Sequence, residues 1–134
     1  MKRFLADQRG DFVQAALTLP IILLVTLGLV NMAMLGIAGI NANNAANYGA
    51  RRGSVAQQNA VEIAAAGAWG KINQAPVGTY SVSVMGGGGR GSRIAVLVSY
   101  QVPNFFGGLS AFFGKESTPV FQKEVVSYFR QEGW

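Results

Sequence analysis

No charged residue occurs between Asp11 and Arg51, and most of this interval, Phe12 to Ile40, is almost continuously apolar. The apolar segment has 29 residues, whereas a transmembrane helix needs about 20. As a helix it would be about 43 Å long, which exceeds the hydrocarbon core of a bilayer. It is also longer than the apolar region of a common signal peptide, about 7–15 residues. The chain is therefore predicted to begin with a membrane-inserted stem helix.

The basic residues before this segment predict its orientation. Residues 1–10 contain three Lys or Arg and one Asp, a net charge of +2, and positively charged flanks tend to stay in the cytoplasm. We therefore expect three parts. Residues 1–11 form a basic cytoplasmic leader, residues 12–53 form a stem helix that spans the membrane before assembly, and residues 54–134 form a small exported head.

The composition argues against an enzyme. The chain has no His and no Cys, which excludes Ser–His and Cys–His catalysis, thiolate metal sites and disulfides. Its six carboxylates are scattered, and no two have a spacing that suggests an acid/base pair or a metal cage. We expect no catalytic, cofactor-binding or metal-binding residues. The net charge of +5 is dispersed along the chain, which fits anionic headgroups and solubility better than nucleic acid.

The stem has features of a helix that packs against other helices. Gly28, Gly36 and Gly39 would let another backbone approach closely, although a lone anchor also tolerates small residues. Pro20 removes one helical hydrogen bond and predicts a kink or a locally unwound turn. After Ile40 the sequence is rich in Ala and Asn and has no Pro, so the helix is expected to continue, increasingly polar, to about Arg52 or Gly53.

Two stretches of the stem resemble a known signature. The chain reads QRGDFVQAALTLP from Gln8 to Pro20 and NAANYGAR from Asn44 to Arg51, on either side of the aliphatic block. These residues resemble the N-terminal signature of TadE-like pseudopilins of the tight-adherence (Tad) pilus system. That signature has Arg-Gly, then Val-Glu-Phe-Ala-Leu, a Leu-Pro, the hydrophobic stretch and an Ala-rich segment ending in Gly-Ala-Arg. The resemblance covers about the first 55 residues, and no motif in the head matches a known family.

The resemblance implies a structural subunit, a pilin, of a helical filament used for adhesion, aggregation or motility. Its partners would be other copies of itself, membrane lipid before assembly, and a pilus machine with a cytoplasmic ATPase and, where the leader is removed, a prepilin peptidase. It would reside in a bacterial inner membrane and then in an extracellular pilus. Two alternatives stay open: a minor pseudopilin that remains anchored as an assembly component, and a small single-span protein whose head binds a ligand or an envelope polymer.

The resemblance also implies processing between Gly10 and Asp11. The family glutamate that would pair with the new amine falls at Gln14, and its spacing from Gly10 is one residue shorter than usual. Without a new amine, a buried glutamate would be an unpaired charge that costs several kcal/mol. The neutral Gln14 therefore favours the hypothesis that the leader is retained.

The head is predicted to be α+β. Residues 55–74 have apolar residues at helical spacing, including Val61 and Trp69 on one face, and indicate a second helix. Alternating or β-rich runs then predict three antiparallel strands at 79–85, 94–102 and 120–129. The glycine run 86–92 is expected to be a hairpin loop. It lacks the Gly-Lys-Ser/Thr ending of a phosphate-binding loop, although Arg90 and Arg93 offer anion contacts.

Two phenylalanine pairs, Phe105–Phe106 and Phe112–Phe113, lie seven residues apart between the last two predicted strands. They would either complete the core of this small head or form a contact between subunits.

Overall fold

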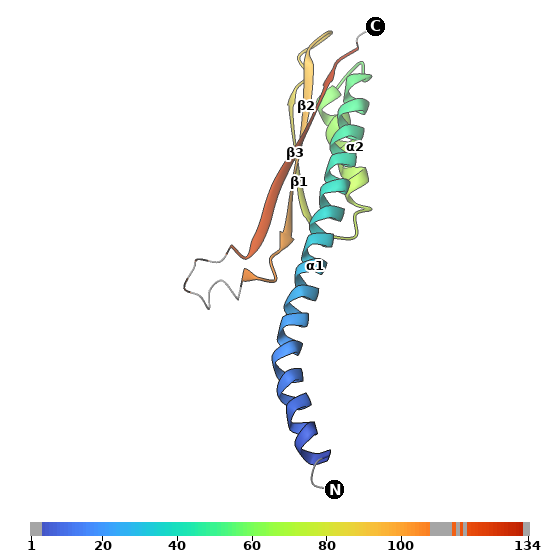
Figure 1. Cartoon of the computed structure of the whole chain (residues 1–134). Helices are drawn as coiled ribbons and strands as arrows, with labels where there is room; N and C mark the ends of the chain where they lie inside the picture. Colours follow the sequence, from blue (N-terminus) through green and yellow to red (C-terminus); the bar gives the residue numbers. More distant parts are fainter. Residues whose placement is uncertain (1–3, 108–113, 115, 117, 133–134) are drawn as a thin grey trace.

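The computed structural model describes residues 4–107, 114, 116 and 118–132 of the chain. The protein has an α+β fold, as predicted, with a long N-terminal helix, a second helix and a three-stranded antiparallel sheet. Figure 1 shows that the N-terminal part of the long helix extends well beyond the sheet. The elements are α1 (Phe4–Ser54), α2 (Ala60–Ile72), β1 (Thr79–Gly86), β2 (Arg93–Pro103) and β3 (Val120–Arg130).

The N-terminal part of α1 stands apart from the rest of the chain. All residues from Gly10 to Leu23 are exposed, and the helix continues through Pro20 without an unwound turn. Two hydroxyls in this part are satisfied within the helix: Thr18 Oγ1 donates to the carbonyl oxygen of Gln14 at 2.7 Å, and Thr26 makes the same bond to Ile22 at 2.8 Å. Such i−4 bonds let Ser and Thr sit in a helix without an unpaired polar group.

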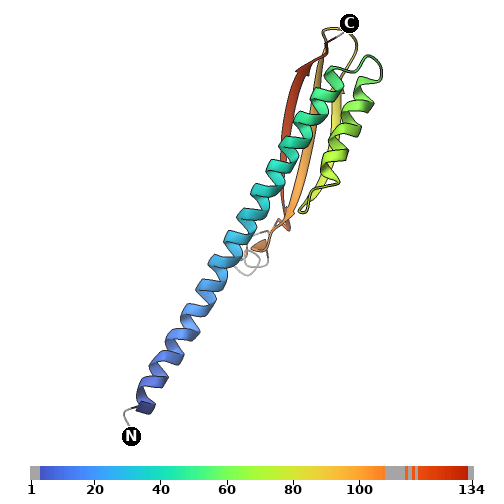
Figure 2. The ribbon, with the colours of Figure 1, turned by 90° about the vertical axis from the view of Figure 1, so that its right-hand side faces the viewer.

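The C-terminal part of α1 belongs to the head. Five alanines on this part are fully buried against the sheet and α2, namely Ala38, Ala42, Ala45, Ala46 and Ala50. Figure 2 shows this part of α1 and the whole of α2 lying side by side along the sheet. The segment expected to be the end of the stem is therefore also the central helix of the head's core.

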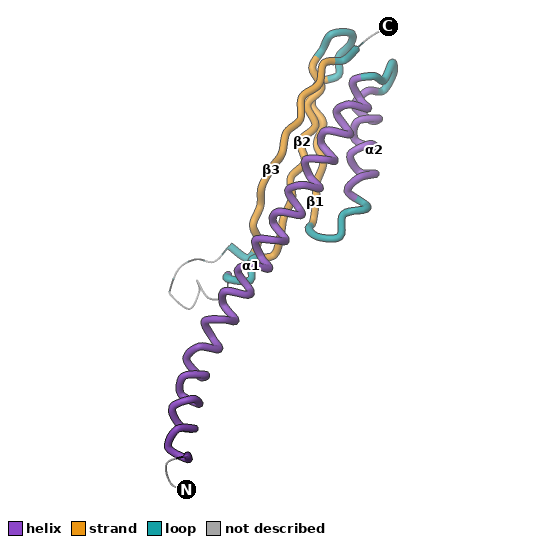
Figure 3. Tube along the Cα trace, turned by 45° about the vertical axis from the view of Figure 1, so that its right-hand side comes forward, coloured by secondary structure: helices purple, strands orange, loops and turns teal. Residues whose placement is uncertain are grey.

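The sheet has the order β1-β2-β3, with β2 in the middle. Alternate residues of β2 point toward the helices, and Ile94, Val96, Val98 and Val102 are fully buried there. Both helices lie on this one face of the sheet (Figure 3). The three strand predictions are confirmed to within one or two residues at each end, because a half-buried strand shows its period of two directly in the sequence.

The glycine run connects β1 to β2, as a hairpin loop should. Gly86, at the end of β1, has a φ of 95°. A Cβ atom there would clash with the carbonyl oxygen of Arg93 on the paired strand. Glycine is therefore required where the chain leaves β1.

The second helix starts later than the sequence predicts. It begins at Ala60 rather than Val55, because residues 55–59 form the turn that reverses the chain from α1 to α2. Asn59, with a φ of 52°, precedes the first helical residue. The predicted apolar face is also partly wrong, since Val61 and Trp69 are exposed. The buried face consists of smaller residues and one isoleucine: Ala60, Ala64, Gly67, Ala68 and Ile72.

Small residues dominate this face because α1 and α2 cross very closely. A Cβ atom on Gly49 would lie 2.6 Å from the carbonyl oxygen of Ala64, and one on Gly53 would lie 2.7 Å from the Ala64 Cβ. Neither distance is sterically allowed. The pair Gly49 and Gly53, four residues apart on α1, thus forms the contact surface for α2.

Candidate assembly surface and a polar groove

The projecting stem presents a large apolar surface that the rest of the chain does not cover. Among the described residues, Gly10–Ser54 is the one helix long and apolar enough to cross a membrane. In its most apolar stretch of 18 residues, only 11% is buried by the rest of the chain. The exposed side chains include Phe12, Leu17 and Leu29. A continuous apolar surface of this length requires lipid or protein to cover it.

Only one of the three glycines predicted for stem packing faces open space. No atom lies within 4 Å of a Cβ built on Gly36. At Gly28 that position is 3.2 Å from Phe106 Cζ, and at Gly39 it is 3.0 Å from the Tyr100 hydroxyl. Gly28 and Gly39 therefore accommodate side chains of the same chain, whereas Gly36 leaves room for another molecule.

The other predicted stem residues lie on the uncovered part of α1. Gly10, Asp11, Gln14 and Pro20 are all exposed. Within the part of the chain that the structure describes, no ion pair involves Asp11, and the Gln14 side chain has no hydrogen bond. Any register that these side chains set would therefore arise from contacts with another molecule.

The first phenylalanine pair lies where the head meets the stem. Phe105 is half-exposed, while Phe106 packs over Gly28 of α1. The backbone nitrogen of Phe105 donates a hydrogen bond to Asn31 Oδ1 at 3.0 Å. In the sequence, Asn31 is one of the polar residues that interrupt the apolar stem. In the structure it is 2% exposed. Phe112 and Phe113 lie outside the described residues.

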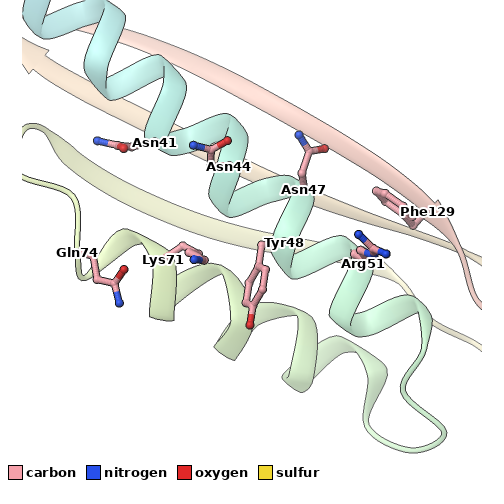
Figure 4. A pocket seen from close by; sticks show the side chains of 8 residues that line it. All are labelled: Asn41, Asn44, Asn47, Tyr48, Arg51, Lys71, Gln74 and Phe129. Carbon is pink, nitrogen blue, oxygen red and sulfur yellow. The ribbon is translucent and has the colours of Figure 1, made fainter.

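A polar groove of about 590 Å³ follows the outer side of α1 in the head. Figure 4 shows its side chains, which come from three elements. Among the described residues, no carboxylate lines it. The lining residues are Asn41, Asn44, Asn47, Tyr48 and Arg51 from α1, Lys71 and Gln74 from α2, and Phe129 from β3.

Two cations of this region are arranged around one aromatic ring. Lys71 Nζ lies 5.0 Å from the centroid of the Tyr48 ring, and Arg52 Cζ lies 5.9 Å from it. Both distances permit cation–π attraction, worth about 0.5–1 kcal/mol at an exposed site. Tyr48 therefore helps to orient Lys71 toward the groove.

Hydrogen bonds fix one wall of the groove and leave other groups free. Asn47 accepts a bond from the Ser127 hydroxyl at 2.6 Å and donates to Asn43 at 3.2 Å. Among the described residues, the side chains of Asn44, Arg51 and Gln74 have no hydrogen-bond or ion-pair partner. The sequence signals the α1 part of this groove only as an Asn-rich helix, because Lys71, Gln74 and Phe129 reach it through the tertiary fold.

A tyrosine pair lies beyond the Asn41 end of the groove. The Tyr80 hydroxyl donates to the carbonyl oxygen of Val77 at 2.5 Å, and its ring lies 6.5 Å from that of Tyr100. Burial raises the pKa of Tyr80, a hydrogen bond with Asn41 opposes the rise, and Tyr100 adds to it.

The comparisons with known proteins bear on the stem. No curated protein and no solved structure matches the chain. The family model described as TadE-like protein matches residues 12–51. This segment begins at the first residue of the apolar run and ends at Arg51 in the last turn of α1, so it covers both the exposed stem and the part of α1 buried in the head. Over residues 12–51, the stem and the buried part of α1, this chain is similar to TadE-like proteins.

Proposed function

We propose that the chain is a structural subunit, a pilin, of a Tad-type helical filament resembling a type IV pilus. The family match associates it with Tad pili. The observation that carries the proposal is the apolar stem, which is exposed from Gly10 to Leu23 while the other end of the same helix is buried in the head. A subunit that packs its stem against those of neighbouring copies would cover this surface after leaving lipid.

Packing between identical copies explains how a filament would form. A contact between two different surfaces of the same chain repeats without closing and produces an open helical array. Gly36 offers a point where a neighbouring backbone approaches closely. The stems would then form the centre of the filament, with the heads outside.

The polarity of α1 limits which part of it packs in this way. Beyond Ile40 its outer side carries Asn44, Tyr48 and Arg51, and covering these with an apolar stem would leave polar groups unpaired. The apolar bundle would therefore involve mainly residues 12–40, rather than the whole helix.

In this proposal the protein is a non-catalytic component. It is inserted in the bacterial inner membrane, extracted by machinery with a cytoplasmic ATPase, and delivered to an extracellular pilus that serves adhesion, aggregation or motility. A membrane-anchored minor pseudopilin is the alternative within the same family. The observation that fits this alternative is the polar outer side of α1 beyond Ile40, because it shortens the apolar surface available for packing between stems.

Electron microscopy and quantitative mass spectrometry of sheared surface material would test the proposal. A major subunit should dominate that fraction and show helical order. Retention of the whole protein in washed membranes would contradict a filament role, whereas trace amounts in the filaments would identify a minor component.

A matched pair of variants tests the role of the stem. Gly36→Leu and Gly70→Leu both add a side chain where a Cβ meets nothing within 4 Å, the first on the stem and the second on α2. We expect only Gly36→Leu to reduce filament yield, with both proteins folded. Equal yields would show that stems do not pack at Gly36.

A further inference from the structure

The polar groove on the outer side of α1 has an unbalanced positive charge. Arg51 and Lys71 line it, Arg52 lies nearby on the Tyr48 ring, and none of the lining residues that the structure describes is a carboxylate. In the described part of the chain, none of these cations has an ion-pair partner. A concave surface lined by one sign of charge concentrates field and attracts ligands of the opposite sign. The groove therefore favours an anion.

The neutral lining groups favour a polar occupant over an apolar one. Asn44 and Gln74 are exposed, and each amide offers both donors and an acceptor. If the apolar stem of another copy covered them, these amides would lose their hydrogen bonds to water, and each unpaired group would cost free energy. A second copy would also bring a net charge of +5 to a positive surface. Both considerations disfavour this protein itself as the occupant.

The groove is also shaped and partly pre-ordered. Its volume of about 590 Å³ falls within the range of about 300–1,000 Å³ that is usual for small-ligand sites. Tyr48 orients Lys71, and Asn47 is fixed by Ser127 and Asn43. Side chains that are held before binding lose less entropy when a ligand arrives. Phe129 adds an apolar surface at one end.

We propose that this groove binds an acidic glycan, a chain of sugars that carry carboxylates. Arg51 and Lys71 contact the carboxylates, Asn44 and Gln74 pair with hydroxyls, and Phe129 packs against the C–H face of a sugar ring. Amides, cations and an aromatic surface together match the three kinds of group on such a sugar. An inorganic anion would use only the cations, and a neutral glycan would leave the cations without partners.

Calorimetric titration of the full chain in detergent micelles tests this assignment. The probes are oligogalacturonate, its methyl ester as the uncharged counterpart, and oligoglutamate of equal charge. We expect oligogalacturonate to bind at least tenfold more tightly than either of the others. Equal affinity for the methyl ester would overturn the role of the cations, and equal affinity for oligoglutamate would show charge attraction or an acidic peptide site instead of a glycan site.

Two double variants of equal charge locate the binding. Arg51→Gln with Lys71→Gln removes the cations of the groove. Arg93→Gln with Arg130→Gln removes a cross-strand pair on the opposite face of the sheet. We expect a loss of at least tenfold in affinity from the first and less than twofold from the second. A similar loss in both would overturn the proposal in favour of nonspecific attraction by net charge.

A third variant separates hydroxyl recognition from charge. Asn44→Ala with Gln74→Ala keeps both cations and changes only exposed side chains, so the head is expected to stay folded, as circular dichroism would verify. Affinity for oligogalacturonate should fall about threefold to tenfold. Unchanged affinity would show that the amides do not contact the sugar.

Discussion

The side-chain oxygen of Asn31 accepts a hydrogen bond from the backbone nitrogen of Phe105 at 3.0 Å, although the two residues are 74 positions apart. Asn31 is the first buried residue of α1, counting from Gly10. The bond joins the stem to the segment that follows β2. This pair marks the point where the stem enters the head.

Replacing Asn31 by alanine should weaken that junction. The Phe105 N–H would lose its acceptor, and an unpaired buried group costs about 1–3 kcal/mol. We expect lower thermal stability and faster amide exchange at Phe105. Asn44→Ala changes an exposed side chain that has no hydrogen bond among the described residues. It should alter neither the thermal stability nor the amide exchange at Phe105. Unaltered exchange at Phe105 in Asn31→Ala would show that this bond does not hold the segment.

The close crossing of α1 and α2 predicts opposite effects for two glycine substitutions. Gly49→Ala places a Cβ atom 2.6 Å from the Ala64 carbonyl oxygen, and overpacking of this kind costs about 1–3 kcal/mol. Gly70→Ala meets no atom within 4 Å and should stabilise α2 by up to about 1 kcal/mol. Denaturant unfolding of the two variants measures both changes. A Gly49→Ala protein as stable as the wild type would contradict the observed helix spacing.

Tyr80 predicts a loss of stability in alkali. Its folded-state pKa lies above the ordinary value of 10.0, mainly because of burial. The unfolded chain therefore loses this proton first, so the stabilisation is complete below about pH 10 and declines as the pH rises toward the folded pKa. Melting temperatures from about pH 8 to pH 11 should fall less steeply for Tyr80→Phe than for the wild type. Tyr128→Phe, at an exposed position, should follow the wild-type curve.

Gln14 predicts the fate of the leader. If a neutral residue stands there because no new amine forms at Asp11, the mature protein should keep residues 1–10. Intact mass spectrometry of protein purified from its native cells measures this directly. A mature protein that begins at Asp11 would refute leader retention, and would leave Gln14 without this explanation.

The sequence predicted the elements of the fold better than their contacts. The strands were predicted well because alternation in Tyr80, Val82 and Val84 reports local burial. The start of α2 was wrong because the turn at 55–59 is required by the packing of two helices, which an Ala-rich sequence does not reveal. Ala38–Ala50 resembled a continuation of the stem, since alanine is equally compatible with lipid, solvent and a tightly packed core.

For the candidate sites too, local features were predictable from the sequence and tertiary contacts were not. The apolar stem was predictable because its surface is continuous along one helix. Gly28 and Gly39 suggested contacts between molecules, whereas their neighbours are Phe106 and Tyr100 of the same chain. The groove was not predictable because its cations and amides come from helices that are separated in the sequence by a turn.

The shared use of α1 by stem and head has a mechanical consequence. No linker separates the exposed stem from the buried alanines that pack against β2, since both belong to one uninterrupted helix. Tension applied to the stem would therefore reach the sheet directly. Any rotation of the stem would also rotate the head. Folding is coupled in the same way, because the apolar face of β2 has its partner only once residues 42–50 of α1 are helical and packed against it.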